Sequence, residues 1–207
     1  LLGLNIEGSD IGILLDNSAS MTDEKLIDVI NRKFASDAEK KSAPKWTRAV
    51  RVVHWLIARV PRTSKLTVVS FNKEAHLLGS KNFIEVTDQK SIQKISQAIY
   101  HLIPEGGTNL QSAIDKIAKL NPKLSNLYVI TDGLPTLGEK GSGLTAFRKC
   151  GSFFGKKTTI SGECRQILFY NTVKKSPLRQ VKVNVILLPL EGDPSAAKAY
   201  WDWTSST

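Results

Sequence analysis

Five short apolar segments, separated by longer segments with helical periodicity, constrain the fold of this chain more than any other feature. Short, nearly all-apolar segments of this kind are typical of strands that a sheet buries on both faces. The first segment stops abruptly at Asp16. Only the three residues Asn72-Lys73-Glu74 separate the second segment from the third, so we expect the third segment to pair antiparallel at a sheet edge. The segments are Ile11–Leu15, Leu66–Phe71, Ala75–Leu78, Leu127–Ile130 and Val181–Leu188.

The intervening segments carry apolar residues at three- and four-residue spacing, which predicts amphipathic helices. They cover residues 46–60, 92–102, 110–120, 164–173 and 194–203. Alternation of strands and helices predicts an α/β fold with a doubly wound, Rossmann-like sheet. We expect the sheet to be mostly parallel, with one antiparallel edge strand and helices on both faces. No internal repeat or low-complexity linker interrupts the chain, so residues 1–207 are expected to form one domain.

Two segments exceed what this plan requires. Residues 22–43 contain an inserted helix, for which Thr22 is the expected N-cap and Leu26, Ile27, Ile30 and Phe34 share one face. Residues 134–161 form a long connection rich in Gly, Lys and Ser. A connection of this length within a domain is usually functional.

Composition excludes several classes of protein. No apolar run approaches the roughly 18–20 residues that span a bilayer. The two cysteines, Cys150 and Cys164, are too few for a zinc ribbon and lack the spacing of a redox motif. The net charge of +10 comes mostly from a basic stretch between residues 140 and 182. Such a stretch favours an acidic partner, although a solvated surface without a partner is an equally open interpretation.

Oxygen-bearing residues gather where the predicted strands end. Asp16, Ser18 and Ser20 follow the first strand, Asp132 follows the strand that ends at Ile130, and Thr108 precedes a helix. Ligands of an open α/β sheet bind beyond the carboxyl ends of its strands. An all-oxygen set suits a hard divalent cation, Mg²⁺ first with Ca²⁺ or Mn²⁺ as alternatives, and does not suit zinc. A helix cap or a turn would account for the presence of any one of these residues. Such local roles account less well for three groups of oxygen-bearing residues at the ends of three predicted elements.

The sequence lacks residues that common catalytic motifs require. A phosphotransferase of the haloacid dehalogenase type needs a second carboxylate where Ser18 stands. None of the three histidines (His54, His76 and His101) follows a late strand as the histidine of a catalytic triad does. Gly106-Gly107-Thr108 lacks the ending of a P-loop. The basic stretch lacks the interleaved aromatic residues of a nucleic-acid platform. We therefore expect no enzymatic activity and no nucleic-acid partner.

The motifs Asp16-Asn17-Ser18-Ala19-Ser20, Gly106-Gly107-Thr108 and Thr131-Asp132-Gly133 closely resemble, in this order, the metal-ion-dependent adhesion site of the von Willebrand factor type A domain. The resemblance covers essentially the whole chain. It implies that Ser18, Ser20 and Thr108 ligate one divalent cation directly. It also implies that Asp16 and Asp132 act mainly through waters. With neutral direct ligands, an open coordination position favours an exposed Asp or Glu of a protein partner.

Further expectations depend on the same resemblance. Asn17, Asn109, Lys156 and Lys157 are candidate partner-binding residues beside the metal. Cys150 and Cys164 are either a disulfide or two free thiols, and the extracellular and periplasmic members of the family favour the disulfide. The family usually has one more edge strand after the last helix, and no residues remain here to form it.

The inserted helix resembles a bacterial subgroup that is often carried on membrane-anchored envelope proteins. The resemblance therefore implies a periplasmic, cell-envelope or extracellular location and a metal-dependent adhesion or protein-binding function. The alternative is an intracellular scaffold or regulatory subunit that acts with a partner ATPase.

Overall fold

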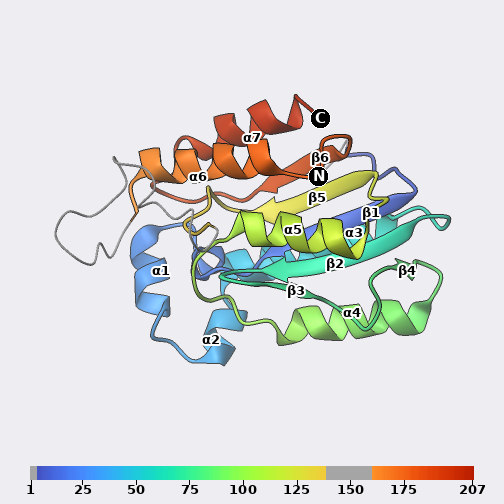
Figure 1. Cartoon of the computed structure of the whole chain (residues 1–207). Coiled ribbons are helices and arrows are strands. Elements are labelled where there is room, and N and C mark those ends of the chain that lie inside the picture. Colours follow the sequence, from blue (N-terminus) through green and yellow to red (C-terminus); the bar gives the residue numbers. More distant parts are fainter. Residues whose placement is uncertain (1–3, 139–159) are drawn as a thin grey trace.

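One mixed sheet organises the computed structural model, which describes residues 4–138 and 160–207 (Figure 1). The strand order is β3-β2-β1-β5-β6, and β4 pairs with β2 beside β3. The central four strands are parallel, whereas β3 and β4 run antiparallel to β2. Their bounds are β1 (Asp10–Asp16), β2 (Lys65–Phe71), β3 (Ala75–Leu77), β4 (Ile84–Glu85), β5 (Asn126–Thr131) and β6 (Lys182–Leu187). The sheet is mostly parallel as predicted, and the two-residue strand β4, which the sequence did not reveal, extends its antiparallel edge.

Helices cover both faces of the sheet (Figure 1). One face packs against α3 (Pro44–Arg59) and α4 (Gln89–His101). The opposite face packs against α5 (Leu110–Leu120), α6 (Gly162–Lys175) and α7 (Ala196–Thr204). These helices confirm the predicted doubly wound arrangement.

Alternation along β1 explains how one strand serves two cores. Ile11, Ile13 and Leu15 belong to the apolar cluster beneath α3 and α4, whereas Leu14 belongs to the cluster beneath α5 and α7. All four side chains are fully buried. Successive strand residues point to opposite faces, so a strand covered on both sides is apolar at nearly every position.

The inserted segment differs from its prediction. It forms two short helices, α1 (Leu26–Arg32) and α2 (Asp37–Lys41), instead of one. Thr22 is not a helix N-cap: it lies in the 3-10 turn η1 (Ala19–Thr22), and its hydroxyl donates to the carbonyl of Ala19. Ser36 instead caps α2 through a complete capping box with Glu39. Capping preferences are local, and Ser36 with Glu39 satisfies two backbone donors where Thr22 satisfies none.

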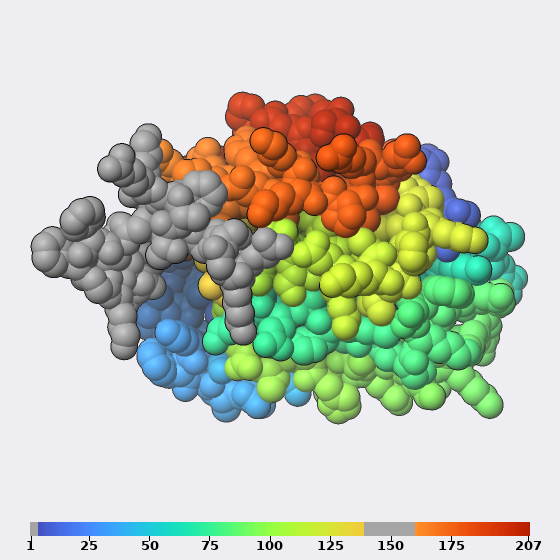
Figure 2. All heavy atoms as spheres, viewed as in Figure 1, coloured from blue at the N-terminus to red at the C-terminus, as the bar shows by residue number. Residues whose placement is uncertain are grey.

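The predicted apolar face of α1 does not enter the core. Leu26, Ile27, Ile30 and Phe34 are all exposed, and Phe34 retains 85% of its accessible surface. Helical spacing shows which side chains share a face but does not show what that face meets. α1 lies at the end of the molecule where the parallel strands end, and α1 and α2 form part of the surface there (Figures 1 and 2).

On the other side of the sheet β6 is the outermost strand, and within residues 160–207 no strand follows α7. The described ends of the long connection, residues 134–138 and 160–161, contain no helix or strand. Over the described residues, no helix combines the length and the apolar character that crossing a membrane requires.

Candidate metal site at the carboxyl edge of the sheet

Two neighbouring parallel strands deliver the predicted acidic residues to one edge of the sheet. β1 ends at Asp16, and β5 ends at Thr131, directly before Asp132. β1 and β5 pair in parallel from Ile11 with Asn126 to Leu15 with Ile130. Parallel strands in register end at the same rim, so the two carboxylates lie close together.

Hydrogen bonds join four of the five predicted ligands into a continuous chain. The Ser18 amide donates to Asp16 Oδ1 over 2.8 Å, and the Ser18 and Ser20 hydroxyls lie 3.1 Å apart. The Ser20 hydroxyl donates to Asp132 Oδ1 over 3.0 Å. The other oxygen of Asp16 accepts a bond of 2.7 Å from the hydroxyl of Thr131. Four oxygen-bearing side chains are therefore assembled at the rim before any cation binds.

Thr108 is brought to this rim by its loop. The Ala19 amide donates to the Gly106 carbonyl over 3.0 Å, and the Glu105 amide donates to the Asn17 carbonyl over 2.8 Å. Thr108 is buried, and in the described part of the chain its hydroxyl makes no hydrogen bond, including none to the other four residues. Its hydroxyl oxygen is therefore uncommitted.

Burial governs the electrostatics of the two carboxylates. Burial raises the pKa of Asp16 to about 7, and the negative charge of Asp132 adds to this rise, whereas hydrogen bonds from Thr131 and Ser18 oppose it. Burial also raises the pKa of Asp132, against the opposing charge and hydrogen bond of Lys45. Each carboxylate is thus held away from water beside a like charge, an arrangement that nearby positive charge would stabilise.

The donor set fits a hard divalent cation. Two buried carboxylates and three hydroxyls provide only oxygen, which Mg²⁺, Mn²⁺ and Ca²⁺ prefer. Over residues 4–138 and 160–207, no group of three or more His, Cys, Asp and Glu residues is placed to hold a metal. A cation at this rim would therefore depend on the serine and threonine hydroxyls as much as on the carboxylates.

Lys45 is a site residue that the sequence reasoning missed. Its ammonium lies 2.7 Å from Asp132 Oδ2 and donates a 3.0 Å hydrogen bond to the carbonyl of Pro189. Its side chain is only 1% exposed. The signal is visible in the sequence: Lys45 shares the buried stripe of α3 with Ala49, Val53 and Leu56. A lysine on an apolar stripe needs a buried partner.

A second ion pair, between Arg165 and Asp193, holds the backbone that follows Asp132. Arg165 of α6 lies 2.8 Å from Asp193 and also donates to the carbonyl of Leu134. Asp193 accepts a bond of 2.7 Å from the amide of Leu134. The loop after β6 is thereby bound to the residues that follow Asp132.

A basic pocket of about 460 Å³ opens beside the rim. Its lining includes Ala19, Gly106 and Gly107, which are neighbours in sequence of the predicted ligands. The charged residues of the lining are basic apart from Glu105: they are Arg32, Lys33, Lys40 and Lys73. Arg32 is paired with Asp23, and Lys40 lies 4.0 Å from Glu105. In the described part of the chain, no ion pair neutralises Lys33 or Lys73.

The other candidate residues are placed as follows. The side-chain amide of Asn17 donates to the carbonyl of Ile103, and the side-chain oxygen of Asn109 caps α5 by accepting from the backbone amide of Ser112. Both side chains thus hold the backbone of the rim. Lys156 and Lys157 lie outside the described residues. Cys164 is buried in α6 and is disulfide-bonded, whereas Cys150 also lies outside the described residues, so the pairing itself stays a prediction.

Comparisons with known proteins agree with this architecture. The profile of the von Willebrand factor type A domain family matches residues 11–134. Manganese-loaded TRAP protein of Plasmodium vivax is similar in structure, with a TM-score of 0.53 and 16% identity over 96% of this chain and 63% of that one. An aerotolerance-related membrane protein of Bacteroides fragilis has a TM-score of 0.50 and 19% identity over 91% of this chain and 76% of that one.

A third similar structure is the type V pili tip protein Mfa5 of Porphyromonas gingivalis, with a TM-score of 0.42 and 20% identity over 63% of this chain. The chain spans only 20% of that three-domain structure. No curated protein matches the sequence. Because the family profile covers more than half of the chain, and the strand order and helical layers accompany it, the chain belongs to the von Willebrand factor type A domain family.

Proposed function

We propose that this domain captures an acidic side chain of a protein partner through one divalent cation, Mg²⁺ first, held at the carboxyl edge of the sheet. The observation that carries the proposal is the chain of contacts from Ser18 through Ser20 to Asp132, beside the buried carboxylate of Asp16. Ser18, Ser20 and Thr108 would hold the cation directly. Asp16 and Asp132 would hold it through water.

The protein's own residues prepare this site. Asp16 fixes the loop after β1 through the Ser18 amide, and Asp132 orients the hydroxyl of Ser20. Carboxylates that orient ligands in this way commonly change metal affinity by about 10- to 100-fold. When bound, the cation supplies a positive charge that neutral hydroxyls leave largely available to an incoming carboxylate.

The charge of the neighbouring pocket supports an acidic partner. Lys33 and Lys73 line it without an ion-pair partner in the described part of the chain. An acidic segment would be attracted both by the cation and by the lysines of the pocket. Salt screens the attraction of the exposed lysines more strongly than that of the cation.

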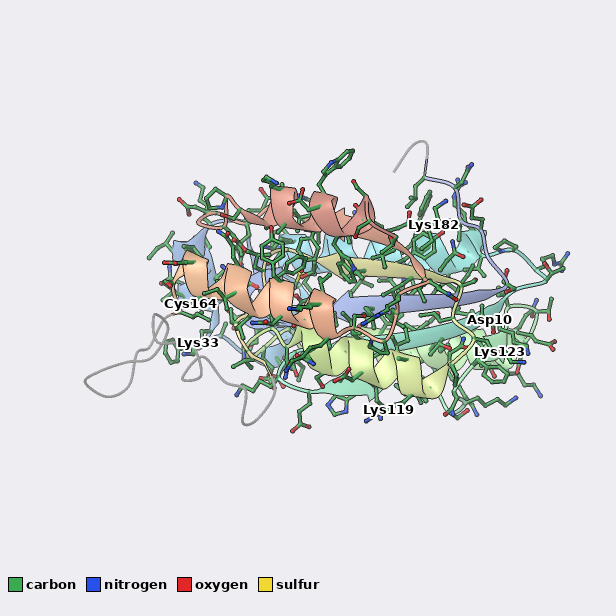
Figure 3. All side chains as sticks on the ribbon, turned by 45° about the horizontal axis from the view of Figure 1, so that its top comes forward. Asp10, Lys33, Lys119, Lys123, Cys164 and Lys182 are labelled. Carbon is green, nitrogen blue, oxygen red and sulfur yellow. The ribbon has the colours of Figure 1, made fainter. Side chains whose placement is uncertain are left out.

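Titration calorimetry with Mg²⁺, Mn²⁺ and Ca²⁺ on chelator-treated protein tests the metal site. Asp16→Asn should weaken cation binding by about tenfold or more. Asp10→Asn is the matched control, because Asp10 begins the same strand at the opposite end of the molecule (Figure 3). It should bind the cation as the wild-type protein does. If the wild-type protein binds none of the three cations, the proposal is wrong.

A glutamate-rich synthetic peptide tests the partner class. We expect it to bind in the presence of Mg²⁺ and not with chelator. Lys33→Glu combined with Lys73→Glu should weaken this binding. Lys119→Glu combined with Lys123→Glu is the charge-matched control, since Lys119 lies in the last turn of α5 and Lys123 follows that helix, both away from the rim (Figure 3). Equal losses in the two double variants would show that the peptide responds only to net charge.

We also propose that the site binds without catalysing a reaction. In the described part of the chain, no hydrogen bond joins His54, His76 or His101 to Ser18 or Ser20, so neither serine has the base that a nucleophile needs. Metal-dependent turnover of a phosphate or carboxylate ester would contradict this.

For the location of the protein we propose the cell envelope or the outside of the cell. The bonded state of Cys164 supports this, because disulfides persist in oxidising compartments. The similar Bacteroides fragilis structure is that of a membrane protein. Mass spectrometry of protein taken directly from cells, with and without reductant, tests the proposal: a reduced Cys164 in the native source would contradict it.

The second candidate function is an intracellular scaffold that works with a partner ATPase. The exposed apolar residues of α1, with Phe34 just after it, favour a protein contact that needs no cation. The two candidates differ in one measurement: partner capture that survives chelator, and that Phe34→Ser abolishes, favours the scaffold.

A further inference from the structure

The buried ammonium of Lys45 shares its acceptor with the proposed metal site. It contacts Asp132 Oδ2 at 2.7 Å while Ser20 occupies Asp132 Oδ1 at 3.0 Å. The side chains of Lys45 and Asp132 are 1% and 2% exposed. A charge pair this deep is scarcely screened by solvent or salt. The ammonium therefore contributes strongly to the electrostatic field at the rim.

When both carboxylates are ionised, the charges around the rim do not balance without a cation. Asp16 and Asp132 are both buried, and Lys45 is the positive group in direct contact with either of them in the described part of the chain. Arg165 acts on Asp132 only at a distance, because its own ion pair is with Asp193. Within residues 4–138 and 160–207, the hydrogen bonds that Asp16 accepts come from neutral groups, among them the Ser18 amide and the Thr131 hydroxyl.

We propose that Lys45 is an internal counter-cation that keeps the cation-free domain folded and weakens the binding of the divalent cation. This inference rests on the proposed function, since it assigns a regulating residue to that site. Removing an ammonium beside a buried carboxylate leaves that carboxylate without a counter-charge, which destabilises the fold. The same removal makes the rim more negative, which strengthens its attraction for a divalent cation.

Both effects have a consequence for partner capture. With Lys45 in place, two carboxylates face one ammonium and a divalent cation, which leaves a net positive charge at the loaded rim. Without it, the charges of the cation and the two carboxylates cancel. Lys45 thus trades affinity for the cation against attraction for an acidic partner.

Two variants of Lys45 separate its charge from its packing. Lys45→Gln keeps a long side chain with hydrogen-bond donors but removes the charge, and Lys45→Arg keeps the charge. We expect Lys45→Gln to bind Mn²⁺ or Mg²⁺ about tenfold or more tightly than the wild-type protein. Lys45→Arg should bind within about threefold of the wild-type affinity, because it preserves the charge.

Thermal unfolding supplies a readout that does not depend on partner binding. With chelator, Lys45→Gln should melt well below the wild-type protein, and added Mn²⁺ should recover most of the difference, because a ligand stabilises the state that it binds more tightly. Lys182→Gln is the control: it breaks the exposed Lys182–Glu7 pair at the start of β6, at the end of the sheet opposite the oxygen cluster (Figure 3). Its loss should be the same with chelator and with Mn²⁺. If Lys45→Gln does not fold in chelator, refolding it in Mn²⁺ replaces the melt, and failure in both conditions overturns the inference.

The outcomes distinguish this inference from the proposed function. If the wild-type protein binds cation but Lys45→Gln binds no more tightly, the inference is overturned and the metal site stands. If only Lys45→Gln binds cation, the inference is supported and the proposed function of the wild-type protein fails. If neither binds, both are overturned.

Discussion

The hydroxyl of Ser20 donates a 3.0 Å hydrogen bond to Asp132 Oδ1 and so joins the loop after β1 to the residue that follows β5. The bond fixes the distance between two groups that the chain separates by 112 positions. It also uses the carboxylate oxygen that Lys45 leaves free. The arrangement of the oxygen atoms at the rim therefore depends on the hydroxyl of Ser20. Removing this hydroxyl should disturb the site more than it destabilises the fold.

Ser20→Ala should weaken Mg²⁺ binding by about tenfold or more, because it removes one proposed ligand and releases Asp132. The cost in unfolding free energy should be only about 1 kcal/mol, as for the loss of one hydrogen bond. Calorimetry and urea unfolding measure the two quantities. Ser125→Ala is the control: it removes a hydroxyl that bonds to the backbone of Asp10 at the other end of β1. It should cost similar stability and leave cation binding unchanged.

Arg165→Met should lower the unfolding free energy by about 3 kcal/mol or more, because it leaves Asp193 buried without its ion-pair partner. The Asp193 side chain is only 3% exposed. Lys198→Met breaks the exposed pair between Lys198 and Asp202 on α7 and should cost less than about 1 kcal/mol. Urea unfolding of both variants measures the difference. Similar losses would show that the Arg165–Asp193 pair is no stronger than a surface pair.

Gly12→Ala should destabilise the domain by about 1–3 kcal/mol through overpacking. A Cβ atom at residue 12 would lie 2.7 Å from Ile117 Cδ1 and 2.9 Å from Leu124 Cδ1, so these two buried side chains would have to move to admit it. Gly162→Ala is the matched control, since a Cβ atom at residue 162 meets nothing within 4 Å. Urea unfolding should show no loss for this control. If Gly12→Ala has the same unfolding free energy as the wild-type protein, the neighbouring side chains move aside without loss of stability.

The unfolding free energy should fall as the pH is lowered through the range in which His54 gains a proton. Burial lowers the pKa of His54 in the folded domain, whereas an unfolded histidine titrates near about 6.5. Between these two values the unfolded chain binds more protons than the folded one, so acidification favours unfolding. Among the residues that the structure describes, the buried Nε2 atom has no hydrogen-bond partner to compensate for the charge.

Urea unfolding of the wild-type protein and of His54→Leu, at neutral pH and at mildly acidic pH, measures this contribution. The variant should lose less stability than the wild-type protein over that interval. Equal pH dependence in the two proteins would exclude His54 as its source.

The fold followed from the sequence because its signals are local. Apolar strands such as Ile11–Leu15 and helical stripes such as that of residues 110–120 record burial on each side of a sheet, and the sheet formed as predicted. The convergence of Asp16, Ser20 and Asp132 also followed, since parallel neighbours end at the same rim. β4 escaped prediction because two residues carry no periodicity.

The tertiary structure alone decided which partners the polar and apolar side chains meet. Phe34 follows α1 at the spacing of its apolar residues and yet lies in solvent, where it retains 85% of its accessible surface. Lys45 begins α3 and yet contacts Asp132, which is 87 positions away. The spacing of apolar residues specifies the helix face on which a residue such as Lys45 lies. The charged group that contacts that residue comes from a distant part of the chain. The sequence by itself therefore determined the sheet and its oxygen cluster, and only the folded chain placed a counter-charge beside that cluster.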